Sequence, residues 1–127
     1  MSVSPQKMIE TVEAYVAAFE TSDAEAVARL YAADAVVRDP VDAKPVVGRD
    51  AILAFYQGSM KMGPKLSLHG PVRTSASIAA FAFSVHLTLP KGPCRIDVID
   101  TFEFNPDGLV TQMTAYWGPN NMHGSQE

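Results

Sequence analysis

The feature that most constrains the fold is a change in the spacing of apolar residues at Gly63-Pro64. Before this point apolar side chains recur every three or four residues, as in helices, and after it they alternate with polar ones, as in strands. Three N-terminal helices followed by strands predict an α+β domain in which the helices pack on a curved, antiparallel or mixed sheet. The 127 residues leave room for one domain, spanning 1–127.

Local signals mark where the three helices begin. Ser4 is suited to cap the first helix, and Pro5 is favoured in its first turn. Ser22 and Glu25 have the spacing of a capping box, which predicts the start of a second helix. A third helix is expected over about residues 50–60.

The strands are separated by turns rich in proline and glycine. Alternation predicts strands over 66–74, 79–89, 95–104 and 109–117, with a short one over 35–39. Residues 119–127 are mostly small and polar and predict a flexible tail. A sheet covered by helices on one face leaves its other face open, so we expect a homodimer.

Composition excludes several classes of function. The net charge of −4 argues against a nucleic-acid partner, because phosphate binding needs clustered lysine and arginine. The first residues lack the charged start and apolar middle of a signal peptide, and no apolar run is long enough to cross a bilayer, so we expect neither a signal peptide nor a membrane span. The single cysteine, Cys94, and three scattered histidines match no metal-ligand spacing, and no glycine-rich phosphate loop occurs. We expect a cytoplasmic protein without metal, cofactor or stable membrane association.

Asp100 is the anomalous residue of the predicted strands. It lies in mid-strand, in phase with Val98 and Phe102, and so points toward the core. An ionised carboxylate there costs several kcal/mol without a partner. No basic residue lies in phase beside it, so we expect a raised pKa and a neutral acid that donates a hydrogen bond. An ion pair from another element, or a one-residue bulge that turns the side chain outward, remains an alternative.

Three tyrosines, Tyr15, Tyr31 and Tyr56, lie on inward faces of the predicted helices. A buried hydroxyl needs a hydrogen-bond partner, and most such tyrosines are core residues that have found one. Beside a buried acid, three inward hydroxyls indicate a hydrogen-bond network, because they can satisfy one another.

Asp39 is in phase with Val37 and points inward. An aspartate before a proline is more often only a turn residue. At the mouth of an apolar cavity, however, a carboxylate can act as a general base while neutral donors stabilise an oxyanion. An ionised Asp39 beside Tyr15 and Asp100 suits removal of a proton next to a carbonyl. Return of that proton at another carbon makes the net reaction an isomerisation.

Eight segments carry a resemblance to a known family. They are 12–15 (VEAY), 30–35 (LYAADA), 38–40 (RDP), 47–49 (VGR), 54–56 (AFY), 70–73 (GPVR), 94–100 (CRIDVID) and 113–117 (MTAYW). Over nearly its whole length the chain resembles the bacterial steroid Δ-isomerases (ketosteroid isomerases) of the NTF2-like, or SnoaL-like, superfamily. A neutral acid in the oxyanion hole is an established feature of ketosteroid isomerase, so the chemistry above has a precedent.

The resemblance implies a cone-shaped fold, a homodimer, no cofactor, and a β,γ-unsaturated 3-oxosteroid as substrate. By motif, Asp39 matches the proton-shuttling base and Tyr15 and Asp100 match the oxyanion donors. Tyr31 and Tyr56 match the tyrosines that extend the network behind Tyr15. The apolar residues expected around the substrate are Phe55, Phe81, Phe83, Val98, Met113 and Trp117.

Other functions on this architecture remain open. An epoxide hydrolase would need an Asp–Arg–Asp relay inside the cavity, whereas Arg38 and Arg95 fall on outward phases. A dehydratase would need a histidine near the base, and none is in register. A steroid or lipid carrier would keep the pocket without turnover, and a dimeric scaffold would bind no ligand.

Overall fold

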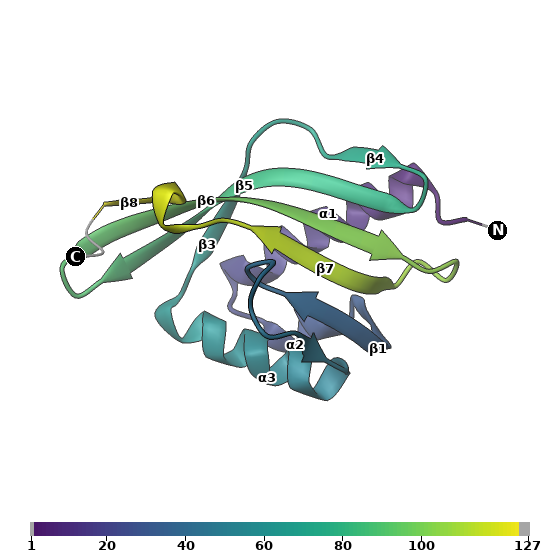
Figure 1. The fold of residues 1–127 in the computed structure, drawn as a ribbon, viewed down its shortest axis with the longest axis horizontal. Coiled ribbons are helices and arrows are strands. Elements are labelled where there is room, and N and C mark those ends of the chain that lie inside the picture. The colour runs from purple at the N-terminus through teal and green to yellow at the C-terminus, as the bar shows by residue number, and fades with distance from the viewer. Residues whose placement is uncertain (1, 125–127) are drawn as a thin grey trace.

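The structure, a computed structural model, describes residues 2–124 (Figure 1). Its helical elements are α1 (Pro5–Glu20), α2 (Ala24–Ala28), α3 (Arg49–Ser59) and the 3-10 turns η1 (Met60–Met62) and η2 (Pro119–Asn121). Its strands are β1 (Tyr31–Arg38), β2 (Val46–Val47), β3 (Lys65–Leu68), β4 (Arg73–Ser75), β5 (Ile78–Leu89), β6 (Gly92–Phe104), β7 (Val110–Tyr116) and β8 (Met122–Gly124).

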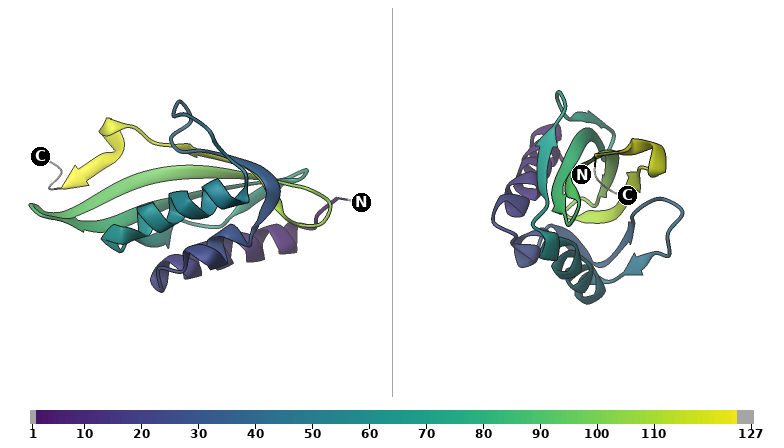
Figure 2. Two further views of the ribbon diagram at one scale, coloured as in Figure 1. Left: turned by 90° about the horizontal axis from the view of Figure 1, so that it is seen from below. Right: turned by 90° about the vertical axis from the view of Figure 1, so that its left-hand side faces the viewer.

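The described strands form one mixed sheet in the order β2-β1-β7-β6-β5-β3, with β4 added to β5 and β8 added to β6. Most neighbours are antiparallel, but β1 runs parallel to β7. The sheet is strongly curved, and α1 and α3 lie on its concave side (Figure 2). The predicted α+β class, with helices on a curved mixed sheet, is therefore confirmed.

Helix α1 begins as its sequence predicts and ends in a way that the sequence conceals. The Ser4 hydroxyl accepts a hydrogen bond from the Lys7 amide at 3.1 Å, and Pro5 occupies the first turn. At the other end, the Asp23 amide donates to the Ala18 carbonyl and the Ser22 amide to the Phe19 carbonyl. These two bonds form a Schellman motif, in which Ser22 adopts a positive φ of 51°.

Several predictions about element boundaries were wrong, among them the placement of Tyr31 in the second helix, since Tyr31 begins β1. The N-cap of α2 is Asp23, whose carboxylate accepts from the Ala26 amide at 3.0 Å, because Ser22 belongs to the end of α1. The single strand over 66–74 is divided into β3 and β4 around Gly70-Pro71, where Gly70 has a φ of 76°. The expected flexible tail over 119–127 includes η2 and β8, and β8 pairs with the first part of β6. Residues 125–127 of the expected tail lie outside the described residues.

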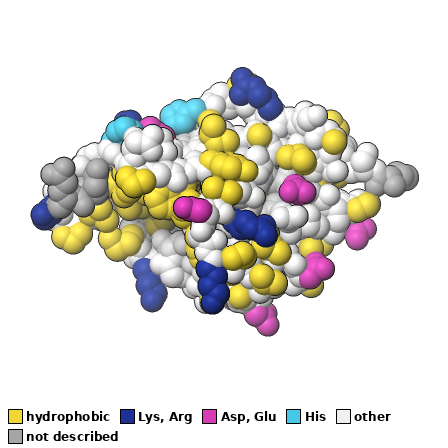
Figure 3. Space-filling view, in the orientation of Figure 1, with side chains coloured by type: hydrophobic (Ala, Val, Ile, Leu, Met, Phe, Trp, Pro, Cys, Tyr) yellow, Lys and Arg dark blue, Asp and Glu magenta, His cyan; other side chains and the backbone are white. Residues whose placement is uncertain are grey.

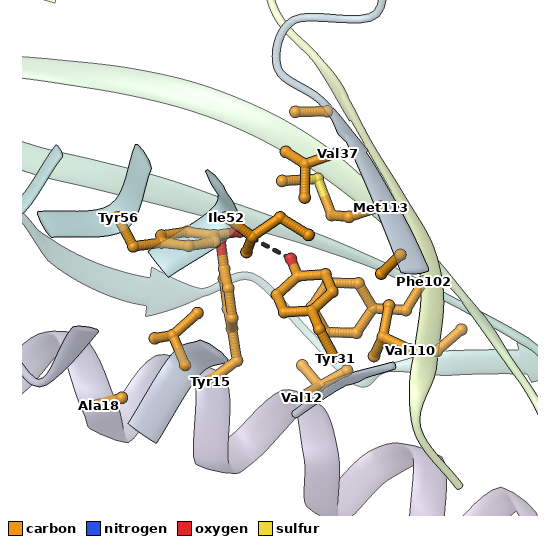
Figure 4. Packing of buried hydrophobic residues seen from close by; sticks show 14 of the residues in the cluster. Val12, Tyr15, Ala18, Tyr31, Val37, Ile52, Tyr56, Phe102, Val110 and Met113 are labelled. Atoms are coloured by element: carbon orange, nitrogen blue, oxygen red, sulfur yellow. Dashed lines mark hydrogen bonds between the residues drawn. The ribbon is translucent and has the colours of Figure 1, made fainter. Parts of the chain in front are cut away.

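The core lies between the concave side of the sheet and the helices (Figure 4). Val12 and Tyr15 reach it from α1, and Tyr56 from α3. Phe102 and Met113 are cross-strand neighbours on β6 and β7 and are fully buried. Aromatic rings dominate this packing, and they place tyrosine hydroxyls inside an otherwise apolar volume.

Candidate active site

A cavity of about 190 Å³ opens between the concave face of the sheet and the helices. Its lining is mainly apolar, with acidic and phenolic groups among the apolar side chains. The residues are Tyr15, Phe19, Asp39, Tyr56, Ser59, Pro64, Leu66, Phe83, Val85, Leu87, Ile96, Val98, Asp100 and Trp117. Few convergent polar groups in an apolar pocket are typical of a small-molecule site.

The three tyrosines form one hydrogen-bonded chain. The Tyr31 and Tyr56 hydroxyls are 2.7 Å apart, and the Tyr56 and Tyr15 hydroxyls are 3.2 Å apart. Figure 4 shows Tyr31 and Tyr56 joined in this way, with Tyr15 reaching up from α1 beside them. Burial raises the pKa of all three hydroxyls well above the usual value, so each is a neutral donor.

Asp100 lies in the cavity wall with 1% of its surface exposed. Neither of its carboxyl oxygens has a hydrogen-bond partner within residues 2–124. Burial raises the pKa of Asp100 well above its ordinary value, and the nearby charge of Asp39 raises it further. These effects favour the neutral carboxylic acid, which presents an unused donor to the cavity.

Asp39 follows the end of β1 and is half-buried at the cavity. The Trp117 indole Nε1–H donates to its Oδ1 at 2.7 Å. Burial raises the pKa of Asp39 above its ordinary value, and the hydrogen bond from Trp117 opposes this by stabilising the carboxylate. Asp39 therefore differs from Asp100 in having both partial contact with solvent and a donor that favours its charged form.

Strand β7 brings the two aspartates to the same level of the sheet. Its parallel pairing with β1 ends with Arg38 opposite Thr114, so that Asp39, the residue after the strand, follows near the level of Ala115. Its antiparallel pairing with β6 places Asp100 opposite the same Ala115. Since neighbouring strands are about 4.8 Å apart, the two backbones are separated by roughly 10 Å across β7.

The apolar residues expected around a ligand divide into two groups. Phe83, Val98 and Trp117 line the cavity. Phe55, Phe81 and Met113 do not, and their expected place in the lining is corrected here. Met113 and Phe81 are buried in the core. Phe81 stacks on Phe83 with 5.4 Å between the ring centroids, and it is the cross-strand neighbour of Asp100. Phe55 is half-buried, and its ring packs against that of Tyr56 with 5.1 Å between the ring centroids.

Sequence reasoning missed part of the lining and one polar contact. The overlooked lining residues are Phe19, Ser59, Pro64, Leu66, Val85, Leu87 and Ile96. Strand phase could have identified Val85, Leu87 and Ile96, which follow Phe83 and Val98 on the same inward faces. The hydrogen bond from Trp117 to Asp39 had no such signal, because it joins side chains 78 residues apart.

A second polar cluster lies on the outer face of the sheet, in an open hollow of about 1050 Å³. There His69 Nε2 lies 2.6 Å from the Ser84 hydroxyl, which donates to Asp97 at 2.6 Å. Arg95 and His123 also contact the Asp97 carboxylate. Its groups pair with one another, unlike Asp100, so the inner cavity rather than this larger hollow is the candidate active site.

Within residues 2–124, no group of three or more histidine, cysteine, aspartate or glutamate side chains is placed to hold a metal ion. The helices of the same part of the chain are too short or too polar to cross a membrane.

The curved sheet, its helical cover and the acidic cavity between them define a cone-shaped α+β protein of the class that houses many small enzymes. Comparison with known proteins places it more closely. The chain belongs to the SnoaL-like family, since the model of the SnoaL-like domain matches residues 12–113. Together with the steroid isomerase relative described next, this match confirms the resemblance to the NTF2-like steroid isomerases. Both findings support the interpretation of the protein as an enzyme of this superfamily.

Relatives of two activities are similar to the chain. A steroid Δ-isomerase of Nocardioides simplex is 39% identical over 112 residues, which cover 87% of this chain and 89% of that protein. The epoxide hydrolase LasB of Streptomyces lasalocidi is 30% identical over 112 residues, which cover 82% of this chain but 39% of the longer relative.

Many solved structures are similar to the chain, and one of them illustrates the shared fold. SalBIII, an epoxide hydrolase/cyclase-like enzyme with a role in pyran ring formation in the polyether salinomycin, matches with a TM-score of 0.85. The match covers 92% of this chain and 95% of SalBIII at 22% sequence identity. At this identity the likeness concerns the fold alone.

Proposed function

We propose that the protein is a steroid Δ-isomerase, which moves the double bond of a β,γ-unsaturated 3-oxosteroid into conjugation with its carbonyl. The observation that carries this proposal is Asp100, a buried acid that lines the cavity and whose two oxygens have no hydrogen-bond partner within residues 2–124. Such a group is expensive to leave unpaired. A substrate carbonyl oxygen that accepts its proton in a hydrogen bond would supply the missing partner.

The reaction follows from the opposite character of the two aspartates. Asp39, as the carboxylate, removes a proton from the carbon between the carbonyl and the double bond. The electron pair of that C–H bond forms a new carbon–carbon double bond to the carbonyl carbon, and the π pair of the carbonyl moves onto its oxygen, which gives a dienolate. The same carboxyl group returns the proton to the γ-carbon, which re-forms the carbonyl and leaves the double bond conjugated.

Tyr15 and Asp100 stabilise the dienolate oxygen in this scheme. Both are neutral donors in an apolar environment, where a hydrogen bond to a developing charge is much stronger than in water. One donor of this kind typically contributes about 2.7–4 kcal/mol, and a positioned base roughly a hundred- to ten-thousandfold in rate. Tyr56 and Tyr31 hold the Tyr15 hydroxyl in place behind the site.

The shape of the lining favours a flat ring system. Asp100, Val98 and Ile96 follow one another on the inward face of β6, so that this wall extends over about 13 Å at roughly 6.7 Å per two residues. Leu87 and Leu66 continue the apolar surface away from the acids. A fused polycycle can thus enter with its carbonyl toward Asp100, and the 39% identical relative supports a steroid.

Epoxide hydrolysis, the activity named for a second relative, has less support. The cavity lining contains two aspartates but, among the described residues, no arginine or lysine. Arg38 donates to Gln112 at 3.0 Å, and Arg95 pairs with Asp97 on the outer face. An acid–arginine–acid relay inside the cavity is therefore missing. A steroid carrier would have no use for a buried acid and a base beside it.

The test is conversion of a β,γ-unsaturated 3-oxosteroid, followed by the ultraviolet absorbance of the conjugated enone. We expect the wild type to turn over and Asp39→Asn to lose most of the rate while still binding a planar phenolic steroid. Asp42→Asn, on the exposed loop after Asp39, is the matched control and should retain the rate. Equal, slow conversion by wild type and Asp39→Asn would refute the isomerase.

We also propose a homodimer formed through the outer face of the sheet. Ile99 and Tyr116 are direct cross-strand neighbours there, and they expose 51% and 47% of their surfaces. Hydrophobic side chains gather across the middle of this face (Figure 3). A two-fold axis would bring such a patch against its own copy. Sedimentation should give twice the chain mass for the wild type and less for Ile99→Lys; a monomeric wild type would contradict the dimer.

A further inference from the structure

The tyrosine chain that supports Tyr15 depends on where Tyr31 is held. Tyr31 is fully buried, and its hydroxyl is 2.7 Å from that of Tyr56, the centre of the chain. Its backbone belongs to the first residue of β1. The ladder between β1 and β7 is irregular just beyond it, because Tyr31 pairs with Val110 but Val36 pairs with Gln112.

The carbonyl of Tyr31 lies on the β2 side of β1, at a level that β2 does not reach. The Val110 amide donates to the Leu30 carbonyl at 2.9 Å, and carbonyls alternate in direction along a strand. The Tyr31 carbonyl therefore points away from β7, toward the side of β2. Strand β2 pairs with β1 only at Val36 and Val37, so it does not reach this carbonyl.

The side chain of Arg49 supplies the donors that the ladder lacks. Its Nε donates to the Tyr31 carbonyl oxygen at 3.1 Å, and its Nη2 donates to the same oxygen. Arg49 is the first residue of α3, the helix that also carries Tyr56. One guanidinium thus ties the strand that bears Tyr31 to the helix that bears its hydroxyl partner.

We propose that Arg49 is a positioning residue for the oxyanion donors, acting through Tyr31 and Tyr56 on the hydroxyl of Tyr15. This inference rests on the proposed isomerase function, in which Tyr15 contacts the dienolate oxygen. Arg49 does not line the cavity and touches no substrate in this scheme. Its effect should therefore fall on turnover and not on substrate affinity.

The sensitivity of the site to small displacements sets the expected effect. Displacement of a catalytic group by about 1 Å can reduce the rate a hundredfold. With Arg49→Gln, the forked pair of donors is lost, and β1 and α3 can shift against each other at Tyr31. We expect kcat to fall about ten- to a hundredfold, while KM stays within about twofold.

The matched control is Arg38→Gln. Arg38 also ties β1 to a neighbouring element, since its Nη1 donates to Gln112 at 3.0 Å, but it lies on the other side of the register irregularity from Tyr31. Loss of a surface tether alone should lower the stability of both variants similarly. Only Arg49→Gln should lower kcat when both are measured well below their unfolding temperatures.

A second measurement does not depend on turnover. Buried tyrosine hydroxyl protons that are hydrogen-bonded to one another should give slowly exchanging, downfield proton resonances in the free wild-type protein. We expect these resonances to persist in Arg38→Gln and to be shifted or lost in Arg49→Gln. If the wild type is inactive, the proposed function fails, and the resonances alone decide whether Arg49 holds the tyrosine chain.

Arg49→Lys keeps the positive charge but loses the two guanidinium donors. Its kcat should be about three- to tenfold below that of the wild type and still above that of Arg49→Gln. This variant decides the matter if Arg49→Gln does not fold. Equal kcat values in Arg49→Gln and Arg38→Gln, unchanged hydroxyl resonances, or an Arg49→Lys enzyme with wild-type kcat would each overturn the proposal.

Discussion

Replacing Trp117 by phenylalanine removes the hydrogen bond to Asp39 and keeps an aromatic ring in the cavity wall. In the wild type, burial raises the pKa of Asp39, and the indole Nε1–H at 2.7 Å opposes that rise by stabilising the carboxylate. Without the donor, burial acts unopposed. The pKa of Asp39 should then rise further, and the acid limb of the profile of kcat/KM against pH should move to higher pH.

The size of the effect follows from the hydrogen bond that is lost. A hydrogen bond to a charged group contributes about 1.5–3 kcal/mol, and the half-buried position of Asp39 favours the lower end because water can partly replace the indole. About 1.4 kcal/mol corresponds to a factor of ten in the ionisation equilibrium. On the acid side of the profile, the variant should therefore be about tenfold slower than the wild type. At pH values above the acid limb, where Asp39 is ionised in both proteins, the kcat/KM values of wild type and variant should agree within about threefold.

The assay is steroid isomerisation, measured by enone absorbance across the pH range in which the protein stays folded. Phe83→Leu is the control, because it alters the cavity wall and leaves the indole donor to Asp39 in place. It should change KM and leave the position of the limb where it is. An acid limb that stays in place in Trp117→Phe, or moves to lower pH, would refute the assigned effect of the indole.

Two further predictions concern Asp100 and Ser22. Because the folded pKa of Asp100 is raised above the unfolded value, the folded state retains this proton as the pH rises, and the contribution of Asp100 to the free energy of unfolding should fall from about pH 4 upward. Urea unfolding at several pH values should show a flatter dependence in Asp100→Asn, and an equally steep one would contradict the raised pKa. Ser22→Gly should stabilise the protein by about 1 kcal/mol by relieving the positive φ, whereas Ser22→Ala should not; thermal unfolding that ranks them otherwise would be inconsistent with strain at this turn.

Local periodicity was enough to predict the parts of the fold that depend on near neighbours in the sequence. The inward phase of Asp100 and the apolar faces that carry Tyr15 and Tyr56 agree with their burial. These signals survive because each residue is placed by its own strand or helix. The division of β3 from β4 was missed although Gly70-Pro71 is visible, because alternation continues across the turn.

Features that depend on distant pairing could not be predicted. Tyr31 was expected on the inward face of the second helix, yet it begins β1, because a parallel partner 79 residues later along the chain, Val110, pairs with it. Met122–Gly124, in the expected tail, form β8 for the same kind of reason, since they pair with residues 94–96 of β6. The polar role of Trp117 likewise exists only once β1 and β7 are side by side. Local pattern carries no information on which strand a residue will meet.

The position of the two aspartates across β7 explains how each can keep its own protonation state. Two carboxylates in one apolar site disfavour each other's ionisation, so that one charge is favoured over two. Asp39 has the indole donor and partial solvent contact, and Asp100 has neither, so the charge resides on Asp39. In the proposed reaction Asp39 becomes neutral as the dienolate becomes negative beside Asp100 and Tyr15. The site then carries one negative charge throughout, which moves from a carboxylate held by one donor to an oxyanion held by two.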